Sequence, residues 1–233
     1  MIAGSLIVLQ ARMASTRLPG KAVRHLAGRS LLARCLTRLL AGEAAPVVLA
    51  TTTNSEDDAL AREAEALGVQ TVRGPEDDVL GRFVLASSSM DTRYVIRATA
   101  DNPAVDIDAA RRVLRVLVSS HSDYVVEHNL PHGAAVEAVS VEALRTADRL
   151  ATAPADREHV TTFVKRARRD FKVIDLEAPR QLRRPDLRFT VDTLEDLQYM
   201  DAVLSSVSSV PVEPPLWSVI DAADRMASRA VCA

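Results

Sequence analysis

The stretch Leu9-Gln10-Ala11-Arg12-Met13-Ala14-Ser15-Thr16-Arg17-Leu18-Pro19-Gly20-Lys21 decides the fold of this chain. Residues 6–9, apolar and partly β-branched, come just before it and predict a buried first strand. Apolar residues at helical spacing follow it, over 31–36. The stretch is therefore a long loop between a strand and a helix. Because ligands of α/β sheets bind beyond the carboxyl ends of the strands, we expect a ligand site here.

Three cations lie within ten residues of this loop: Arg12, Arg17 and Lys21. They would repel one another without a ligand, so their crowding indicates a polyanion, and a triphosphate fits best. The chain has 29 Lys and Arg together, yet only positions 21, 165 and 172 are lysines. A lysine ammonium is a compact point charge, unlike the planar guanidinium, so Lys21 suits a phosphate contact. The alternative is a solvated surface lysine.

Composition restricts the class of protein. At 233 residues, with 48% hydrophobic and 26% charged residues, the chain is expected to form one globular domain with a small extension. A net charge of −2 argues against nucleic-acid binding. Cys35 and Cys232 have no metal-site or disulfide spacing. We expect no signal peptide, no membrane span and a cytoplasmic location.

Strand and helix patterns alternate through the first half of the chain, which predicts an α/β fold with a mostly parallel sheet and helices on both faces. The expected strands are 46–51, 69–72 and 94–97, and the expected helices are 57–67, 78–87 and one that begins near 106.

The second half breaks this alternation. Residues 124–127 and 135–139 flank a Pro-His-Gly turn and predict a small antiparallel insertion, roughly 124–175. We expect one domain over 1–204, then a connector and C-terminal helix over 205–233. The remaining predictions are helices 141–150, 157–168 and 194–204, strands 171–174 and 189–192, a connector 205–215, and a last helix that packs through Trp217, Val219, Ile220 and Met226.

Two aspartates follow predicted strands. Asp101 precedes Asn-Pro, a pair that fixes the backbone, and at this sheet edge it could bind Mg²⁺ together with substrate phosphates. Asp101 could equally be a helix cap or a turn residue. Asp192 lies at a strand-to-helix junction where Thr193 is the expected helix cap, so Asp192 has no obvious local role.

The loop Ala-Arg-x-x-Ser-Thr-Arg-Leu-Pro-Gly-Lys resembles the nucleotide loop of the sugar-acid cytidylyltransferases, which include the 3-deoxy-manno-octulosonate and acylneuraminate enzymes. Gln10 and Met13 are more similar to the spore-coat polysaccharide branch. The resemblance implies a single Rossmann-like (glycosyltransferase-A-like) nucleotidyltransferase domain. It also implies that Asp101 and the Asp of Thr-Val-Asp-Thr-x-Glu-Asp-Leu, Asp192, together bind Mg²⁺.

Further blocks resemble the spore-coat branch, at 73–83 and 155–161. One segment departs from the family: 132–137 reads His-Gly-Ala-Ala-Val-Glu, where the family often has Asp-Gly-x-Asp-x-Glu, so the acceptor could differ. The resemblance implies catalytic roles for Arg12, Lys21, Asp101 and Asp192. It implies nucleotide binding by Gln10, Ala11, Arg12, Ser15, Arg17, Lys21, Thr51, Arg73 and Gly74, and acceptor binding by Arg97, Asn102, Glu137, Arg157, Glu158 and His159.

The expected activity is transfer of CMP from CTP to an acidic acceptor, with release of pyrophosphate and with Mg²⁺ as cofactor. The acceptor would be a sugar acid, a phosphonate or another small acid, and a homodimer is expected. One alternative is a sugar transferase of the same fold, although its usual Asp-x-Asp motif is absent from Asp101-Asn102-Pro103. Another is a catalytically silent nucleotide-binding protein.

Overall fold

The fold is organised around β1 (Ser5–Gln10), whose first five residues are buried. The computed structural model describes residues 1–88, 91–207 and 213–231. β1 pairs in parallel with β4 (Val47–Thr52) on one side and β6 (Tyr94–Thr99) on the other, and β5 (Gln70–Gly74) extends the sheet beyond β4. The strand order is β5-β4-β1-β6-β8-β7-β9. The predicted strands of the first half are confirmed, with ends shifted by one or two residues.

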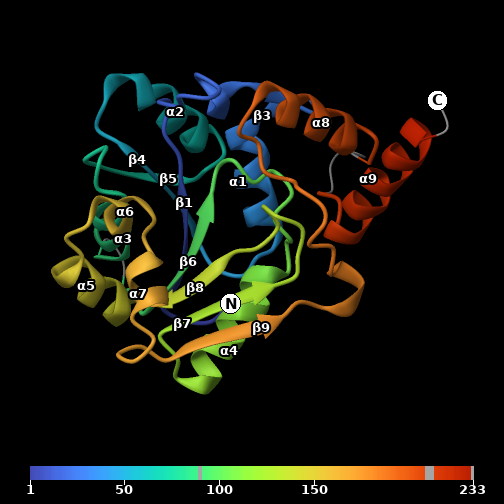
Figure 1. Ribbon diagram of the computed structural model, residues 1–233. Helices are drawn as coiled ribbons and strands as arrows, with labels where there is room; N and C mark the ends of the chain where they lie inside the picture. The colour runs from blue at the N-terminus through green and yellow to red at the C-terminus, as the bar shows by residue number, and fades with distance from the viewer. Residues whose placement is uncertain (89–90, 208–212, 232–233) are drawn as a thin grey trace.

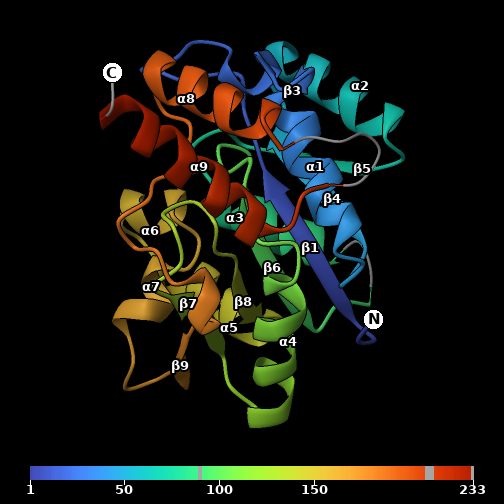
Figure 2. The same cartoon turned by 90° about the vertical axis from the view of Figure 1, so that its right-hand side faces the viewer.

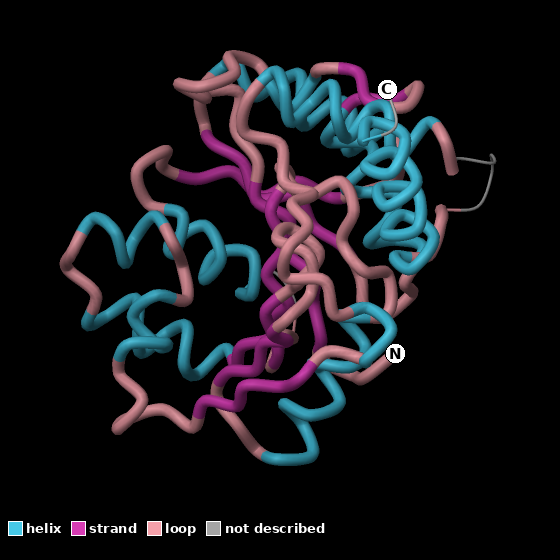
Figure 3. The backbone as a smooth tube through the Cα atoms, turned by 45° about the vertical axis from the view of Figure 1, so that its right-hand side comes forward, coloured by secondary structure: helices cyan, strands magenta, loops and turns pink. Residues whose placement is uncertain are grey.

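Helices cover both faces of this sheet (Figures 1 and 3). Successive residues of a strand point to opposite faces, so Ile7 and Leu9 enter one hydrophobic core and Leu6 and Val8 the other. The first core lies under α1 (Leu31–Ala41), α2 (Asp58–Ala66), α4 (Ala109–Ser120), α8 (Leu194–Ser205) and α9 (Leu216–Val231), and the second lies under α3 (Val79–Ser88), α5 (Val141–Leu150) and α7 (Thr162–Arg166).

Three of these helices begin at a side-chain cap, where an oxygen accepts from an otherwise unpaired backbone N–H. Ser30 caps α1 at 2.9 Å and Ser140 caps α5 at 3.1 Å. Thr193 caps α8, as its sequence predicts, and the structure adds a reciprocal bond from the Thr193 backbone N–H to the Asp196 carboxylate. Short elements complete the chain: the two-stranded sheet β2 (His25–Leu26) and β3 (Arg29–Ser30), and the 3-10 turns η1 (Lys21–Val23), η2 (Ser55–Asp57) and η3 (Arg180–Leu182).

The second half of the chain supplies the other edge of the sheet. β8 (Glu137–Ser140) runs antiparallel to both β6 and β7 (Tyr124–His128), and β9 (Val173–Glu177) pairs in parallel with β7. The antiparallel insertion is therefore confirmed. It continues the main sheet instead of standing apart from it.

Two predicted elements are wrong. The helix expected over 157–168 is split into α6 (Pro154–Glu158) and α7, because fully buried Val160 adopts a left-handed conformation with φ 50°. Residues 189–192 form no ladder. This segment is extended and its Phe189 donates to the carbonyl of His132 at 2.7 Å, next to a single bridge between His132 and Arg188.

The C-terminal helix packs on the same core as α1 and α8 (Figure 2). Val219 and Ile220 are buried, as predicted, but Trp217 is 55% exposed and lies outside this contact. Of the connector expected over 205–215, residues 208–212 lie outside the described part of the chain. None of the described helices combines the length and apolar character that a bilayer-spanning helix needs.

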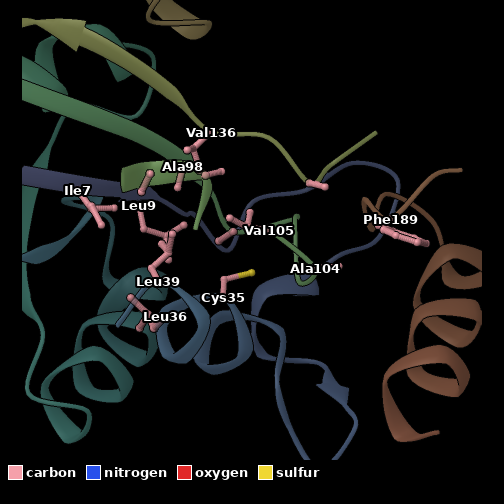
Figure 4. Close-up of a cluster of buried hydrophobic side chains, with 14 of the residues drawn as sticks. Ile7, Leu9, Cys35, Leu36, Leu39, Ala98, Ala104, Val105, Val136 and Phe189 are labelled. Atoms are coloured by element: carbon pink, nitrogen blue, oxygen red, sulfur yellow. The ribbon is translucent and has the colours of Figure 1, made fainter. Parts of the chain in front are cut away.

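Buried side chains also support the loops at the carboxyl ends of the strands. Figure 4 shows Cys35 pointing from α1 toward Ala104 and Val105, which follow β6. The thiol is free and buried, and burial raises its pKa far above the usual range, so it packs as an apolar group. This packing fixes the segment after β6, where Asp101 lies.

Candidate nucleotide site

The loop between β1 and α1 is held against the end of β4 by one buried carboxylate. Asp57 accepts from the backbone N–H of Met13 at 2.7 Å and from the hydroxyl of Thr51 at 2.9 Å. The N–H and hydroxyl of Thr52 donate to the same carboxylate. Asp57 is 2% exposed. Sequence reasoning missed it, because an Asp at the start of a helix is usually only a cap.

Lys21 is placed by its neighbours in the loop. Leu18 and Ala22 on either side of it are buried, and Gly20 provides the left-handed turn, φ 65°, that starts η1. The ammonium of Lys21 lies 3.0 Å from the carbonyl oxygen of Val191, and its side chain is only 18% exposed. The alternative of a solvated surface lysine is therefore wrong.

The two aspartates meet at this ammonium. Lys21 Nζ lies 3.3 Å from Asp101 Oδ2 and 3.3 Å from Asp192 Oδ1. The backbone brings them together, because Val191 donates its N–H to the carbonyl of Asp101 at 2.7 Å. The extended segment before α8 is thus joined to the loop after β6, although the two aspartates are 91 positions apart in the sequence.

Asp192 is also paired with two guanidinium groups. Arg17 contacts Oδ1 at 2.8 Å and Arg188 contacts Oδ2 at 2.7 Å. Arg188 in turn donates to His132 Nδ1 at 3.0 Å, with the ring accepting as the neutral tautomer. His132, from the segment that departs from the family, therefore reaches Asp192 through Arg188. Sequence reasoning missed Arg188, which precedes Asp192 by four positions.

Arg17, Lys21, Asp101 and Asp192 line a pocket of about 710 Å³ at the carboxyl ends of β1 and β6. A hollow of about 820 Å³ along α2 and β5 is larger but contains none of the loop cations. We assign the site to the smaller pocket because the charged groups converge there. Of the predicted residues, it is lined by Gln10, Ala11, Arg12, Ser15, Arg17, Lys21, Arg97, Asp101, Glu158, His159 and Asp192.

Arg12 and Glu158 form an ion pair across the pocket. Arg12 Nη2 lies 3.1 Å from Glu158 Oε1, and both side chains are about a third exposed, at 36% and 37%. Glu158 ends α6, and His159 beside it lines the same pocket. Both residues therefore reach the site from the end of α6, just before the break that separates it from α7.

The block at 73–83 contributes to the pocket through residues other than those predicted. Glu76, Val79 and Arg82 line it, and the helical spacing of Val79 and Arg82 on α3 is a signal that could have found these two. Arg82 is 2% exposed, and burial, with Arg12 nearby, lowers its pKa. A Cβ on Gly74 would lie 2.9 Å from Arg82 Cγ, so Gly74 makes room for this arginine and does not line the pocket itself.

Glu137 lies behind the pocket wall. Its carboxylate accepts from Arg97 at 2.9 Å and from Tyr124, Thr161 and Lys165 at 2.8 Å each. Burial opposes its charge, but Arg97 and Lys165 outweigh this and hold its pKa at about 2. With its oxygens occupied, Glu137 positions Arg97, which does line the pocket. Direct acceptor contact by Glu137 is therefore corrected to an indirect role.

Four other predicted residues do not line the pocket. Thr51 is fully buried against Asp57. Arg73 is used by the β4–α2 loop, with bonds to Thr52, Asn54 and Asp58. The other two brace neighbouring segments: the Asn102 amide donates to Thr99 Oγ1 at 2.8 Å, and Arg157 pairs with Asp78 and Asp148.

The loop cations lie together at the carboxyl edge of a parallel sheet and share their pocket with Asp101 and Asp192. This arrangement places the chain among the nucleotidyltransferases. The family within this class can also be stated. The cytidylyltransferase family model matches residues 6–209, and the chain belongs to that family.

The spore-coat branch is supported by a relative from Bacillus subtilis, the spore coat polysaccharide biosynthesis protein SpsF, 34% identical over 88% of both chains. A 3-deoxy-manno-octulosonate cytidylyltransferase from a Chelativorans species is 34% identical over 51% of this chain and 48% of its own. The structure of a cytidylyltransferase from Leptospira borgpetersenii superposes with a TM-score of 0.89 at 26% identity, covering 97% of this chain and 95% of that one.

Proposed function

We propose that the protein transfers CMP from CTP to a small acidic acceptor and releases pyrophosphate. The observation that carries this proposal is the convergence of Arg12, Arg17 and Lys21 on the pocket that also contains Asp101 and Asp192. The family name supports CTP as the donor. The 3-deoxy-manno-octulosonate relative acts, by its name, on a sugar acid, which supports an acidic acceptor.

The residues of the pocket suit in-line attack by an acceptor oxygen on the α-phosphorus. Phosphoryl and nucleotidyl transfer demand mainly positioning and charge neutralisation, and little covalent work from the protein. Arg12, Arg17 and Lys21 would bind the triphosphate and balance the charge that develops on the leaving pyrophosphate. Arg97, which also lines the pocket, would hold the acid group of the acceptor opposite the nucleotide.

Asp101 and Asp192 fit a divalent cation. They already share one cation, the ammonium of Lys21 at 3.3 Å from each, and carboxylates together with substrate phosphates are the ligand set that Mg²⁺ favours. A bound Mg²⁺ would supply Lewis-acid stabilisation of the α-phosphate.

Three pocket-lining side chains have a buried polar atom without a partner in the described structure: Gln10 Oε1, Arg82 Nε and Arg97 Nε. Such atoms are costly to leave unsatisfied. Each of these atoms is out of reach of solvent in the ligand-free pocket, so a ligand could satisfy it only if the side chain turns toward the pocket as the ligand binds.

The test is to incubate the protein with Mg²⁺, each of the four nucleoside triphosphates and a panel of sugar acids, phosphonates and other small acids, and to measure pyrophosphate. Acceptor-dependent release with CTP alone is expected. Calorimetric titration should rank CTP above UTP, ATP and GTP. A clear preference for a purine would rule out CMP transfer. The homodimer and the cytoplasmic location stay predictions, and the mass of the native protein in solution tests the first.

A further inference from the structure

The ammonium of Lys21 occupies the space between the aspartates expected to bind the metal. It lies 3.3 Å from an oxygen of each and 3.0 Å from the carbonyl of Val191. With three partners and 18% exposure, this side chain is fixed in the ligand-free protein. The same lysine is expected to contact the triphosphate.

The other two cations of the loop are paired in the same way. Arg17 contacts Asp192 at 2.8 Å, and Arg12 contacts Glu158 at 3.1 Å. Each cation of the loop is therefore neutralised by a carboxylate of the pocket. Binding of a triphosphate must exchange these partners, and each exchange leaves a carboxylate free to take a new cation.

A divalent cation bound by both aspartates cannot share their near oxygens with the ammonium. Two positive charges only a few ångströms apart repel strongly in a partly dry site. Lys21 must therefore leave before, or as, the metal enters. The nucleotide phosphates can replace the ion pairs that Lys21 loses when it leaves the aspartates, whereas water can only hydrate its ammonium.

We infer that Lys21 is an internal counter-ion that keeps divalent cations out of the Asp101–Asp192 pair until a nucleotide draws it away. The inference rests on the proposed function, because it takes the aspartates to be the metal ligands of the reaction. Its consequence is an order of binding: the metal binds weakly to the free protein and enters with the nucleotide. By linkage, the factor by which bound metal weakens the contact of Lys21 with the aspartates is also the factor by which removing Lys21 strengthens metal binding.

The test uses Mn²⁺, a hard cation that prefers the same oxygen ligands as Mg²⁺. Free Mn²⁺ is measured by electron paramagnetic resonance during titration of the nucleotide-free, full-length protein. Lys21→Met removes the charge and keeps an unbranched side chain of similar length, and should bind Mn²⁺ about tenfold more tightly than the wild type. Lys172→Met removes the same charge from a lysine that bonds the carbonyl of Ser120, and should bind like the wild type.

The double variant Lys21→Met/Asp101→Asn should lose the gain, which assigns it to the aspartate pair. Equal Mn²⁺ affinity in the wild type and Lys21→Met would overturn the inference. If Lys21→Met does not fold, Lys21→Gln replaces it, because the amide can still donate to the Val191 carbonyl. Pyrophosphate release by the wild type separates the two claims. If the wild type turns over CTP but Lys21→Met binds Mn²⁺ no more tightly, the proposed function stands and only the counter-ion role of Lys21 is rejected.

Discussion

Met13 donates its backbone N–H to the carboxylate of Asp57 at 2.7 Å, which joins the loop between β1 and α1 to the end of β4. Burial alone would raise the pKa of Asp57, but hydrogen bonds from Thr52, Met13 and Thr51 outweigh it and hold that pKa below its usual value. The ionised carboxylate is therefore part of the folded loop. Its contribution to stability is present above the unfolded pKa and is lost as the pH falls through the folded one.

Asp57→Asn should lower the free energy of unfolding by about 2 kcal/mol, because an amide cannot accept all these bonds. Urea denaturation measures this. Asp58→Asn is the matched control: Asp58 is the next carboxylate in the chain, its side chain is 52% exposed, and its loss should change stability by no more than about 0.5 kcal/mol. Equal effects of the two variants would contradict the role given to Asp57.

Glu137→Gln should destabilise the protein by about 3 kcal/mol at pH 7, because it leaves Arg97 and Lys165 beside a neutral group in a partly buried site. The folded pKa of Glu137 is about 2, below the unfolded value of about 4.3. Its stabilisation is thus complete above the unfolded pKa and is lost as the pH falls toward 2. The difference between wild type and variant should shrink at pH 3 in denaturant titrations. Exposed Glu65→Gln should show no such pH-dependent difference.

Asp101→Asn and Asp192→Asn should each lower turnover by orders of magnitude and leave the fold intact. Both aspartates are proposed to bind the same Mg²⁺, so the double variant should be little worse than either single one. Pyrophosphate release at varied Mg²⁺ measures this, with circular dichroism as the check on folding. Asp186→Asn, at an exposed carboxylate paired with Arg184 outside the pocket, is the control. Near-normal Mg²⁺-dependent activity in either single variant would remove that residue from the site.

Lys21→Arg should lower turnover although it keeps the charge, because the proposed contact with the triphosphate suits a compact ammonium, which a planar fork cannot replace. Lys21→Ala should be worse, by a few kcal/mol in the barrier, about what one lost electrostatic contact costs. Arg17→Lys should do less harm, since the Arg17 side chain is 63% exposed and has room for an ammonium. Steady-state kinetics at saturating Mg²⁺ decides, and a fully active Lys21→Arg enzyme would contradict the prediction.

The sequence predicts the strands from local signals, whereas it predicts the pair of aspartates through the resemblance to the cytidylyltransferases. Apolar runs mark β1 and β4, and each Asp follows an extended segment. The split between α6 and α7 was missed because its left-handed residue is Val160, a β-branched residue that rarely adopts this conformation, and no glycine or asparagine marks the break.

The roles of Asp57 and Glu137 also escaped prediction, since their partners come from elsewhere in the chain. Glu137 is recognised as a positioning residue only when β6 brings Arg97 and α7 brings Lys165 to it. The sequence predicts that the block at 73–83 contributes to the site. It does not predict which residues of the block line the pocket, because that depends on which face of α3 turns toward it.

The partly buried position of Lys21 gives the protein a built-in chemical reporter. Apart from the amino terminus, the only other amines are Lys165 and Lys172, and both are more accessible to an acylating reagent. With so few amines, mass spectrometry of the labelled peptides can follow Lys21 alone. Its labelling rate then shows whether the ammonium is still bound to the aspartates, without a substrate analogue or an introduced probe.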